Sequence, residues 1–184
     1  DAALLMDLVS RPDARDFMSL PYQPADYAAA LEGQSGRGLR IGLLLDMGIG
    51  LPVDPAVRAA CEAAAKALED DGAVVESMPS FLTEEMFDSV LRFFEARSFL
   101  EIDAMPEATR AKVLPFIVQW CSHRARNFSG SDVMAAYNGV MAMRAAAVRA
   151  TGAFDFVISP TSPILPYAAD LPSPTDDPGN ALAH

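Results

Sequence analysis

An uninterrupted apolar segment, LRIGLLLD at residues 39–46, constrains the fold of this chain more than any other stretch. Such a run is typical of a strand that is buried on both faces of a sheet. It is followed by a predicted helix with Asp54 at its N-cap, Pro55 at its first position and Gly72 just beyond its end. The segment AVVESM, residues 73–78, predicts a second strand. Because strands joined in this way are almost always parallel, we expect the unit to begin a parallel sheet.

The helix after Asp54 has a predicted inner and outer face. Apolar residues three or four positions apart define the inner face, which consists of Val57, Cys61, Ala64 and Leu68. On the outer face, Glu62 and Lys66 are four positions apart and predict an ion pair.

The remaining periodic segments predict further helices and a third strand. We expect a short apolar helix at residues 1–10, a helix capped by Thr83 and broken at Pro106, a helix over 107–128 with a kink near Pro115, a helix capped by Ser131 and closed by Gly152, and an apolar strand at 154–159. Together these elements predict an α/β fold in which helices cover a mixed, mostly parallel sheet.

The domain organisation follows from the same pattern. Residues 1–170 are expected to form an α/β portion of one domain, and residues 171–184 a proline-rich tail without a packing partner. An apolar helix at the first residue and this tail indicate a fragment of a longer protein. We therefore expect strands at the sheet edges that lack neighbours.

The charge balance argues against several kinds of partner. Asp and Glu outnumber Lys and Arg by 25 to 14, which gives a formal net charge of −11. Binding to nucleic acid or to an acidic membrane needs clustered basic groups, so we expect neither partner. The sequence also has no apolar run of the ~18 residues that a membrane span requires. We expect Cys61 and Cys121 to be reduced and packed, as in a cytoplasmic protein.

The loop after the first strand contains Gly48 and Gly50, and Glu76 ends the next strand. This arrangement has the outline of a dinucleotide site. However, Val53 stands where the third glycine of that motif belongs, nearby prolines remove amide donors, and Asp54 brings a carboxylate to the position of the phosphates. We therefore expect no cofactor. A non-catalytic module that binds a small anion or a nucleotide at this loop is an alternative interpretation.

Neither a metal site nor a thiol nucleophile is predicted. The two histidines are His123 and His184, and their spacing from the cysteines matches no zinc motif. Cys121 and His123 are two positions apart on a predicted helix, so they point to different faces. Cys61 lies in the predicted inner stripe, where a thiol is normally unreactive.

The segment FDFVISPTSPILP, residues 154–166, places hydroxyl groups after a buried strand, at the end of the sheet where ligands of α/β proteins bind. Ser159 and Ser162 nevertheless lack a base, because Lys66 is predicted on an outer helix face and Lys112 is predicted to reach solvent. The two prolines of SPTSP also offer no N–H groups for an oxyanion hole. We therefore predict that the segment is the wall of a pocket and that the chain contains no catalytic residue.

Three stretches, in this order, resemble the amidase signature family of serine hydrolases. Residues 1–21 look like the helix and the Pro-Asp…Arg-Asp…Ser-x-Pro loop that follow the catalytic core of that family. Residues 39–76 resemble its strand–helix–strand unit, with Val-Asp-Pro-x-Val opening the helix. Residues 154–166 resemble its Asp-x-apolar-x-x-Pro-Thr strand and loop. The resemblance covers nearly all of residues 1–170.

This resemblance implies the middle-to-C-terminal portion of an enzyme that cleaves amide C–N bonds. The family acts through a serine, a second serine in a cis peptide and a lysine, and the Gly/Ser-rich segment that carries them is missing from this sequence. The resemblance therefore implies a fragment that is inactive by itself and a small-molecule amide as substrate of the full-length enzyme. Thr161 and Ser162 match the loop near the substrate tunnel, which implies that they contact substrate.

Two alternatives stay open beside the amidase interpretation. One is a non-catalytic module that binds a small ligand, and the other is a structural α/β module. Homo-oligomerisation is compatible with each of them, and the sequence does not choose the oligomeric state.

Overall fold

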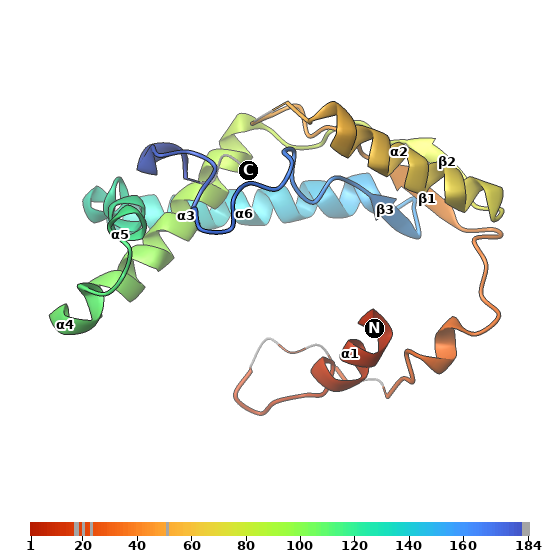
Figure 1. Cartoon of the computed structure of the whole chain (residues 1–184), viewed down its shortest axis with the longest axis horizontal. Helices are drawn as coiled ribbons and strands as arrows, with labels where there is room; N and C mark the ends of the chain where they lie inside the picture. The colour runs from red at the N-terminus through yellow and green to blue at the C-terminus, as the bar shows by residue number, and fades with distance from the viewer. Residues whose placement is uncertain (17–18, 20, 23, 51, 182–184) are drawn as a thin grey trace.

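The structure is a computed structural model of the chain and describes residues 1–16, 19, 21–22, 24–50 and 52–181. Its centre is a sheet of three strands in the order β2-β1-β3, with β1 at Arg40–Leu43, β2 at Val74–Ser77 and β3 at Phe156–Ile158 (Figure 1). Both pairings in this sheet are parallel. The predicted α/β class and the three predicted strands are therefore confirmed, and each strand is shorter than its apolar segment.

The parallel register places the carboxyl ends of the three strands at the same end of the sheet. Gly42 of β1 lies opposite Glu76 of β2 and Val157 of β3. The ladder continues beyond β1, because the N–H of Leu44 donates to the carbonyl of Ile158 at 2.9 Å. Leu44 is only 2% exposed. The loops that follow β1 and β3 consequently start side by side.

Helix α2, Pro55–Asp70, has the ends that the sequence predicts. The Asp54 carboxylate accepts from the N–H of Ala56 at 2.7 Å, and Gly72 has a φ of +101°, a conformation that favours glycine. The predicted inner stripe is wrong at one position, since Ala64 is exposed while its neighbour Ala65 is 4% exposed. Period alone allows either residue, and consecutive alanines carry no further signal.

The predicted ion pair on α2 is also wrong in its partner. The Lys66 ammonium pairs with Asp70, one turn further along the helix, instead of with Glu62. Both carboxylates are four positions from Lys66, so sequence spacing alone does not choose between them.

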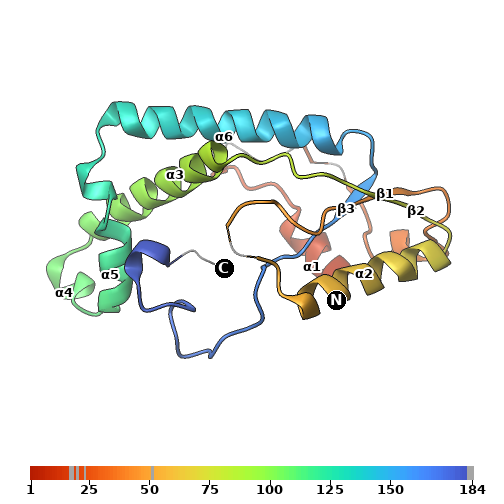
Figure 2. The ribbon, with the colours of Figure 1, turned by 90° about the horizontal axis from the view of Figure 1, so that it is seen from above.

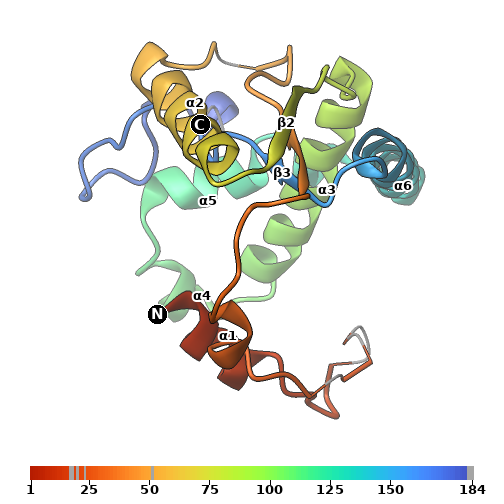
Figure 3. The same ribbon diagram turned by 90° about the vertical axis from the view of Figure 1, so that its right-hand side faces the viewer.

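Helices α3, Glu84–Asp103, and α6, Gly130–Thr151, pack along each other (Figure 2). Figure 3 shows α2 on one side of the strands and α3 and α6 on the other. The predicted cap at Thr83 is confirmed, since its hydroxyl accepts from the N–H of Met86 at 3.2 Å. The predicted cap of α6 at Ser131 is wrong: Ser129 is the N-cap and forms a capping box with Asp132.

The helix predicted over 107–128 is divided into three shorter elements: α4 at Glu107–Arg110, α5 at Pro115–Ser122 and the 3₁₀ turn η2 at Ala125–Asn127. Pro115 is the first residue of α5 and not the site of a kink. A proline disfavours helical dihedral angles in the preceding residue, and Leu114 accordingly has an extended ψ of 131°.

The N-terminal part of the chain extends away from this core. Helix α1, Ala2–Val9, lies apart from the sheet and confirms the predicted terminal helix (Figure 1). Asp7 connects it to the segment before the turn η1, Ala29–Leu31, by accepting from the N–H of Tyr27 at 2.8 Å.

The proline-rich C-terminal segment packs against the core, contrary to our expectation that it has no packing partner. The short turn η3, Pro178–Asn180, contacts α5. Ser173 is 3% exposed, and its hydroxyl donates to the carbonyl of Ala181 at 3.0 Å. Asn180 and Ala181 of this segment line the same space as the loops that follow β1 and β3.

Candidate functional site

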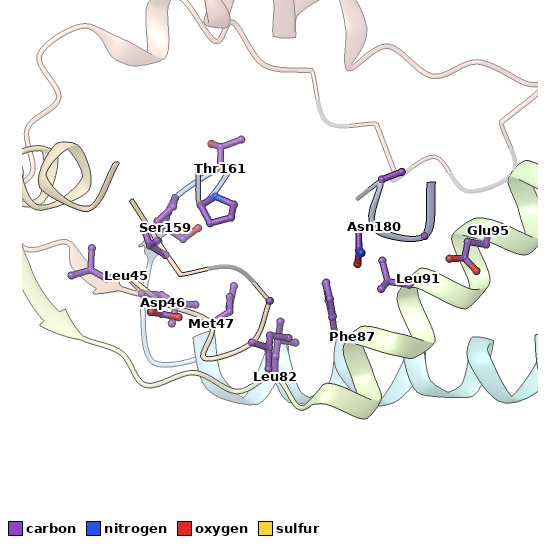
Figure 4. A pocket seen from close by; sticks show the side chains of 18 of the residues that line it. Leu45, Asp46, Met47, Leu82, Phe87, Leu91, Glu95, Ser159, Thr161 and Asn180 are labelled. Carbon is purple, nitrogen blue, oxygen red and sulfur yellow. The ribbon is translucent and has the colours of Figure 1, made fainter. Parts of the chain in front are cut away.

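A pocket of about 680 Å³ opens at the carboxyl ends of β1 and β3 (Figure 4). This is the end of a parallel sheet at which α/β proteins bind ligands. The volume lies within the range of ~300–1,000 Å³ that is common for small-molecule sites. The pocket is the principal candidate for a functional site in the described part of the chain.

The walls of this pocket include residues from the loop after β1, from η3 and from α3. The loop after β1 contributes Leu45, Asp46 and Met47, and η3 contributes Asn180. Helix α3 contributes residues one helical turn apart, which places them on one face: Phe87, Leu91 and Glu95. Figure 4 shows the side chains from these three parts around the same space.

The loop after β3 forms a further wall and contains both predicted site residues. Thr161 lines the pocket together with Ser159. Ser162 lies outside the lining, and its hydroxyl accepts from the N–H of Ile164 at 3.3 Å. The loop is tied to the start of α2, because the carbonyl of Pro163 accepts from the N–H of Asp54 at 2.7 Å. Thr161 therefore lines the pocket, whereas the Ser162 side chain forms a hydrogen bond within the loop.

A charged pair closes one end of the pocket. The guanidinium of Arg124 donates from Nε to Oε2 of Glu95 at 2.9 Å and from Nη2 to Oε1 at 3.0 Å. Its Nη1 donates to Asp88 at 3.2 Å. The hydrogen bonds to Glu95 raise the pKa of Arg124 above its usual value, and the nearby charge of Asp88 contributes to the same shift. Arg124 is therefore firmly cationic, while Glu95 is 7% exposed.

The glycine loop between β1 and α2 folds around its own acidic residue. Asp46 accepts from the N–H of Gly48 at 2.7 Å and lies 3.6 Å from the Arg58 guanidinium. Gly48 and Gly50 have φ values of +71° and +74°, where glycine is favoured. Because the Asp54 carboxylate already caps α2, the helix N-terminus presents an acid where a phosphate would need free N–H groups.

Other candidate chemistry falls outside the pocket or lacks the required environment. Burial raises the pKa of the Cys121 thiol, which favours the unreactive protonated form. Among the residues that the structure describes, no group of three or more His, Cys, Asp or Glu side chains has an arrangement for a metal ion. His184, considered above as a ligand, lies outside the described residues. No helix in the described ranges is long and apolar enough to cross a membrane.

Several residues of the pocket were not predicted from the sequence. The position of Glu95 could have been predicted, because Glu95 follows Phe87 and Leu91 at the same spacing of four residues and so lies on the same face of α3. No sequence pattern predicts the positions of Arg124 and Asn180 in the pocket. Arg124 lies beside η2 and Asn180 lies in η3, and the positions of these two turns depend on tertiary packing.

Comparison with known proteins identifies the class. The family model described as Amidase matches residues 1–183. An acylamidase from Rhodococcus erythropolis is 30% identical over 136 residues, which is 72% of this chain and 28% of that protein. A glutamyl-tRNA(Gln) amidotransferase subunit of Acinetobacter baumannii, strain ATCC 17978, is 36% identical over 84 residues, which is 46% of this chain and 17% of that protein.

A solved structure confirms the fold. A bacterial aryl acylamidase of the amidase signature family superposes with a TM-score of 0.73 at 24% identity, and the match covers 90% of this chain and 35% of that one. The chain therefore belongs to the amidase family. It aligns with less than a third of the length of the curated relatives named above.

Proposed function

We propose that this chain provides part of the substrate-binding wall of an amidase that cleaves amide C–N bonds. In this reaction a serine hydroxyl adds to the amide carbonyl, the amine leaves with a proton, and water hydrolyses the acyl ester to a carboxylic acid. The observation that carries the proposal is the pocket of about 680 Å³ at the ends of β1 and β3 in a chain of the amidase family. The substrate is therefore proposed to be a small-molecule amide.

The residues of the pocket support a role in binding and not in bond cleavage. The hydrogen bond with Asp70 raises the pKa of Lys66 above its usual value, and this exposed lysine is no general base for a serine. The pocket lining includes no lysine among the described residues. We propose that the catalytic serine and lysine come from sequence outside these 184 residues, and that this chain alone has no amidase activity.

Thr161 and Ser162 are proposed to serve the substrate in different ways. The position of Thr161 in the lining supports a direct contact through its hydroxyl. The hydrogen bond from Ile164 to Ser162 supports an indirect contribution, in which Ser162 fixes the loop that carries Thr161.

Labelling of the native protein tests this function. An antibody against this chain would isolate the native product from its source cells, and a fluorophosphonate probe, which reacts with activated serines, would be added before the intact mass is measured. We expect a product heavier than 19.7 kDa that takes up one probe, and no labelling of the isolated 184-residue chain. A native product of 19.7 kDa that takes up no probe would contradict the proposal and favour a non-catalytic binding or structural α/β module.

The location and assembly of the protein are further parts of the proposal. The free thiols of Cys61 and Cys121 support a reducing compartment, which we propose to be the cytoplasm. The outer sides of β2 and β3, unpaired within the described sheet, are compatible with a homo-oligomer, which equilibrium sedimentation of the native product would detect.

A further inference from the structure

Each charged side chain in the described lining of the pocket is already paired with an opposite charge of the protein. The lining contains three such residues: Asp46, Glu95 and Arg124. Asp46 lies 3.6 Å from Arg58, and Glu95 shares its two oxygens with Arg124. A charged ligand would lose its hydration in this pocket without gaining a free counter-charge. The loss would be costly, because transfer of an unpaired charge out of water is strongly unfavourable.

The rest of the lining is mostly apolar and includes large side chains from separate elements. Phe87 and Leu91 come from α3, Trp120 from α5, and Met47 and Ile49 from the loop after β1. Aromatic and branched side chains of this kind bind the faces of a ring through dispersion and the hydrophobic effect. The volume of about 680 Å³ is sufficient for a ligand with a ring-sized group.

Uncharged hydroxyl groups supply the polar contacts of the same pocket. Ser159 and Thr161 line it and are exposed, and neither side chain has a hydrogen-bond partner within the described ranges. A hydroxyl both donates and accepts, so it suits the carbonyl and the N–H of an amide.

We propose that this pocket selects uncharged amides that carry an apolar, ring-sized group and disfavours amides that bear a carboxylate or an ammonium group. The amide part of this inference rests on the proposed function. The selection of neutral over charged ligands follows from the paired charges and from the apolar lining.

The tryptophan of the pocket provides a direct measurement of binding. Trp120 is the single tryptophan of the chain, and it lines the pocket. Butyryl-4-nitroanilide is neutral and absorbs where tryptophan emits, so its binding should quench the fluorescence saturably. Its succinyl analogue adds a carboxylate and its 4-aminobutyryl analogue adds an ammonium group at similar size. Titration of free N-acetyltryptophanamide corrects for absorption by the ligands.

We expect the neutral anilide to bind at least about tenfold more tightly than either charged analogue, a ratio typical of the desolvation of one polar group. Butyramide, which lacks the ring, should compete about tenfold less well than butyranilide in a displacement titration. Binding of a charged analogue within about threefold of the neutral one would overturn the inference, and so would the absence of saturable quenching.

Two variants test whether the anilide binds in this pocket. Leu91→Glu puts a carboxylate into the lining, and Leu100→Glu makes the same change at a residue of α3 that is 68% exposed. We expect Leu91→Glu to weaken binding of the neutral anilide about tenfold and Leu100→Glu to leave it unchanged. Ile49→Glu in the loop after β1 repeats the test without altering a helix, should Leu91→Glu fail to fold by circular dichroism. Unchanged binding in a folded lining variant would overturn the inference.

This result is separable from the test of the proposed function. Probe uptake by the native product together with equal binding of neutral and charged anilides would overturn the selectivity and leave the amidase function standing. Selective binding by this chain without probe uptake by the native product would overturn the amidase function and leave the selectivity for neutral ligands standing.

Discussion

The guanidinium of Arg124 and the carboxylate of Glu95 form a two-point pair, with Nε 2.9 Å from Oε2 and Nη2 3.0 Å from Oε1. The pair joins the start of η2 to the middle of α3, and it forms one end of the pocket. A second carboxylate, that of Asp88, accepts from Nη1 of the same arginine. Loss of Glu95 therefore leaves Arg124 with one carboxylate partner, whereas loss of Arg124 leaves Glu95 without its cationic partner.

We predict that Arg124→Met destabilises the chain more than Glu95→Gln. Without Arg124, Glu95 keeps a charge in a buried position. We expect a loss of about 2 kcal/mol, below the ~3–5 kcal/mol of a fully buried pair, because the arginine side chain is 37% exposed. Without the charge of Glu95, Arg124 retains Asp88, and we expect a loss of about 1 kcal/mol. Urea unfolding of both variants measures the difference, and an equal or reversed order would contradict the prediction.

A second prediction concerns the contact between α3 and α6. A methyl group at Gly139 would overlap the side chain of Ser89 on the opposite helix. We predict that Gly139→Ala lowers the free energy of unfolding by about 1–3 kcal/mol, as overpacking of a tight interface does. Gly130 lies in the same helix, and a methyl group added there would meet no atom within 4 Å, so Gly130→Ala is the matched control and should cost nothing.

Removal of the obstructing side chain provides an internal check. Ser89→Gly combined with Gly139→Ala should recover part of the lost stability, because the methyl group then has room. If the double variant is as unstable as the sum of the single variants, the loss does not come from this contact.

Local chemistry was sufficient to predict most of the fold. The strands, α2 and α3 were predicted because apolar runs, Asp54, Thr83 and Gly72 act within a few residues of their own position. Two of the details that were predicted wrongly involve choices between local equivalents. Ala64 and Ala65 are chemically identical, and Lys66 has a carboxylate on either side at the same spacing.

The pocket was only partly predictable for a different reason. Thr161 follows a strand, so the rule that ligands bind at strand ends identifies its position. Arg124 and Asn180 reach the pocket only after α5 packs against α3 and η3 packs against α5. No short sequence pattern encodes such an arrangement, because it depends on contacts between segments distant in the chain.

The cap of α6 gives a third prediction. The Ser129 hydroxyl accepts from the N–H of Asp132 at 3.2 Å, whereas Ser131 is already within the helix. We predict that Ser129→Ala lowers the free energy of unfolding by about 1 kcal/mol, the usual value for loss of an N-cap. Ser131→Ala should change it by clearly less. A larger effect at Ser131 in thermal melts would show that the helix begins later.

The same cap predicts a dependence on pH. Hydrogen bonds from the hydroxyl and then from the backbone N–H of Ser129 lower the pKa of Asp132 in the folded chain. A carboxyl group whose pKa is lower in the folded than in the unfolded chain stabilises the fold at pH values above its pKa in the unfolded chain. This contribution is lost as the pH falls through its pKa in the folded chain. Asp132→Asn should therefore lower the Tm at pH ~7, and the difference from the wild type should narrow by pH ~3. A difference that stays constant over this range would contradict the prediction.

The last prediction separates the two hydroxyl residues of the loop after β3. Thr161 lines the pocket, whereas the Ser162 hydroxyl accepts from the N–H of Ile164 within the loop. We predict that Thr161→Val, which keeps the shape and removes the hydroxyl, weakens binding of butyryl-4-nitroanilide about fivefold, as the loss of one neutral hydrogen bond does. Ser162→Ala should affect binding less than Thr161→Val and should lower the Tm instead, because it removes a bond that fixes the loop. Quenching of Trp120 and thermal melts of both variants distinguish these effects. A stronger loss of binding in Ser162→Ala would show that Ser162, and not Thr161, provides the contact.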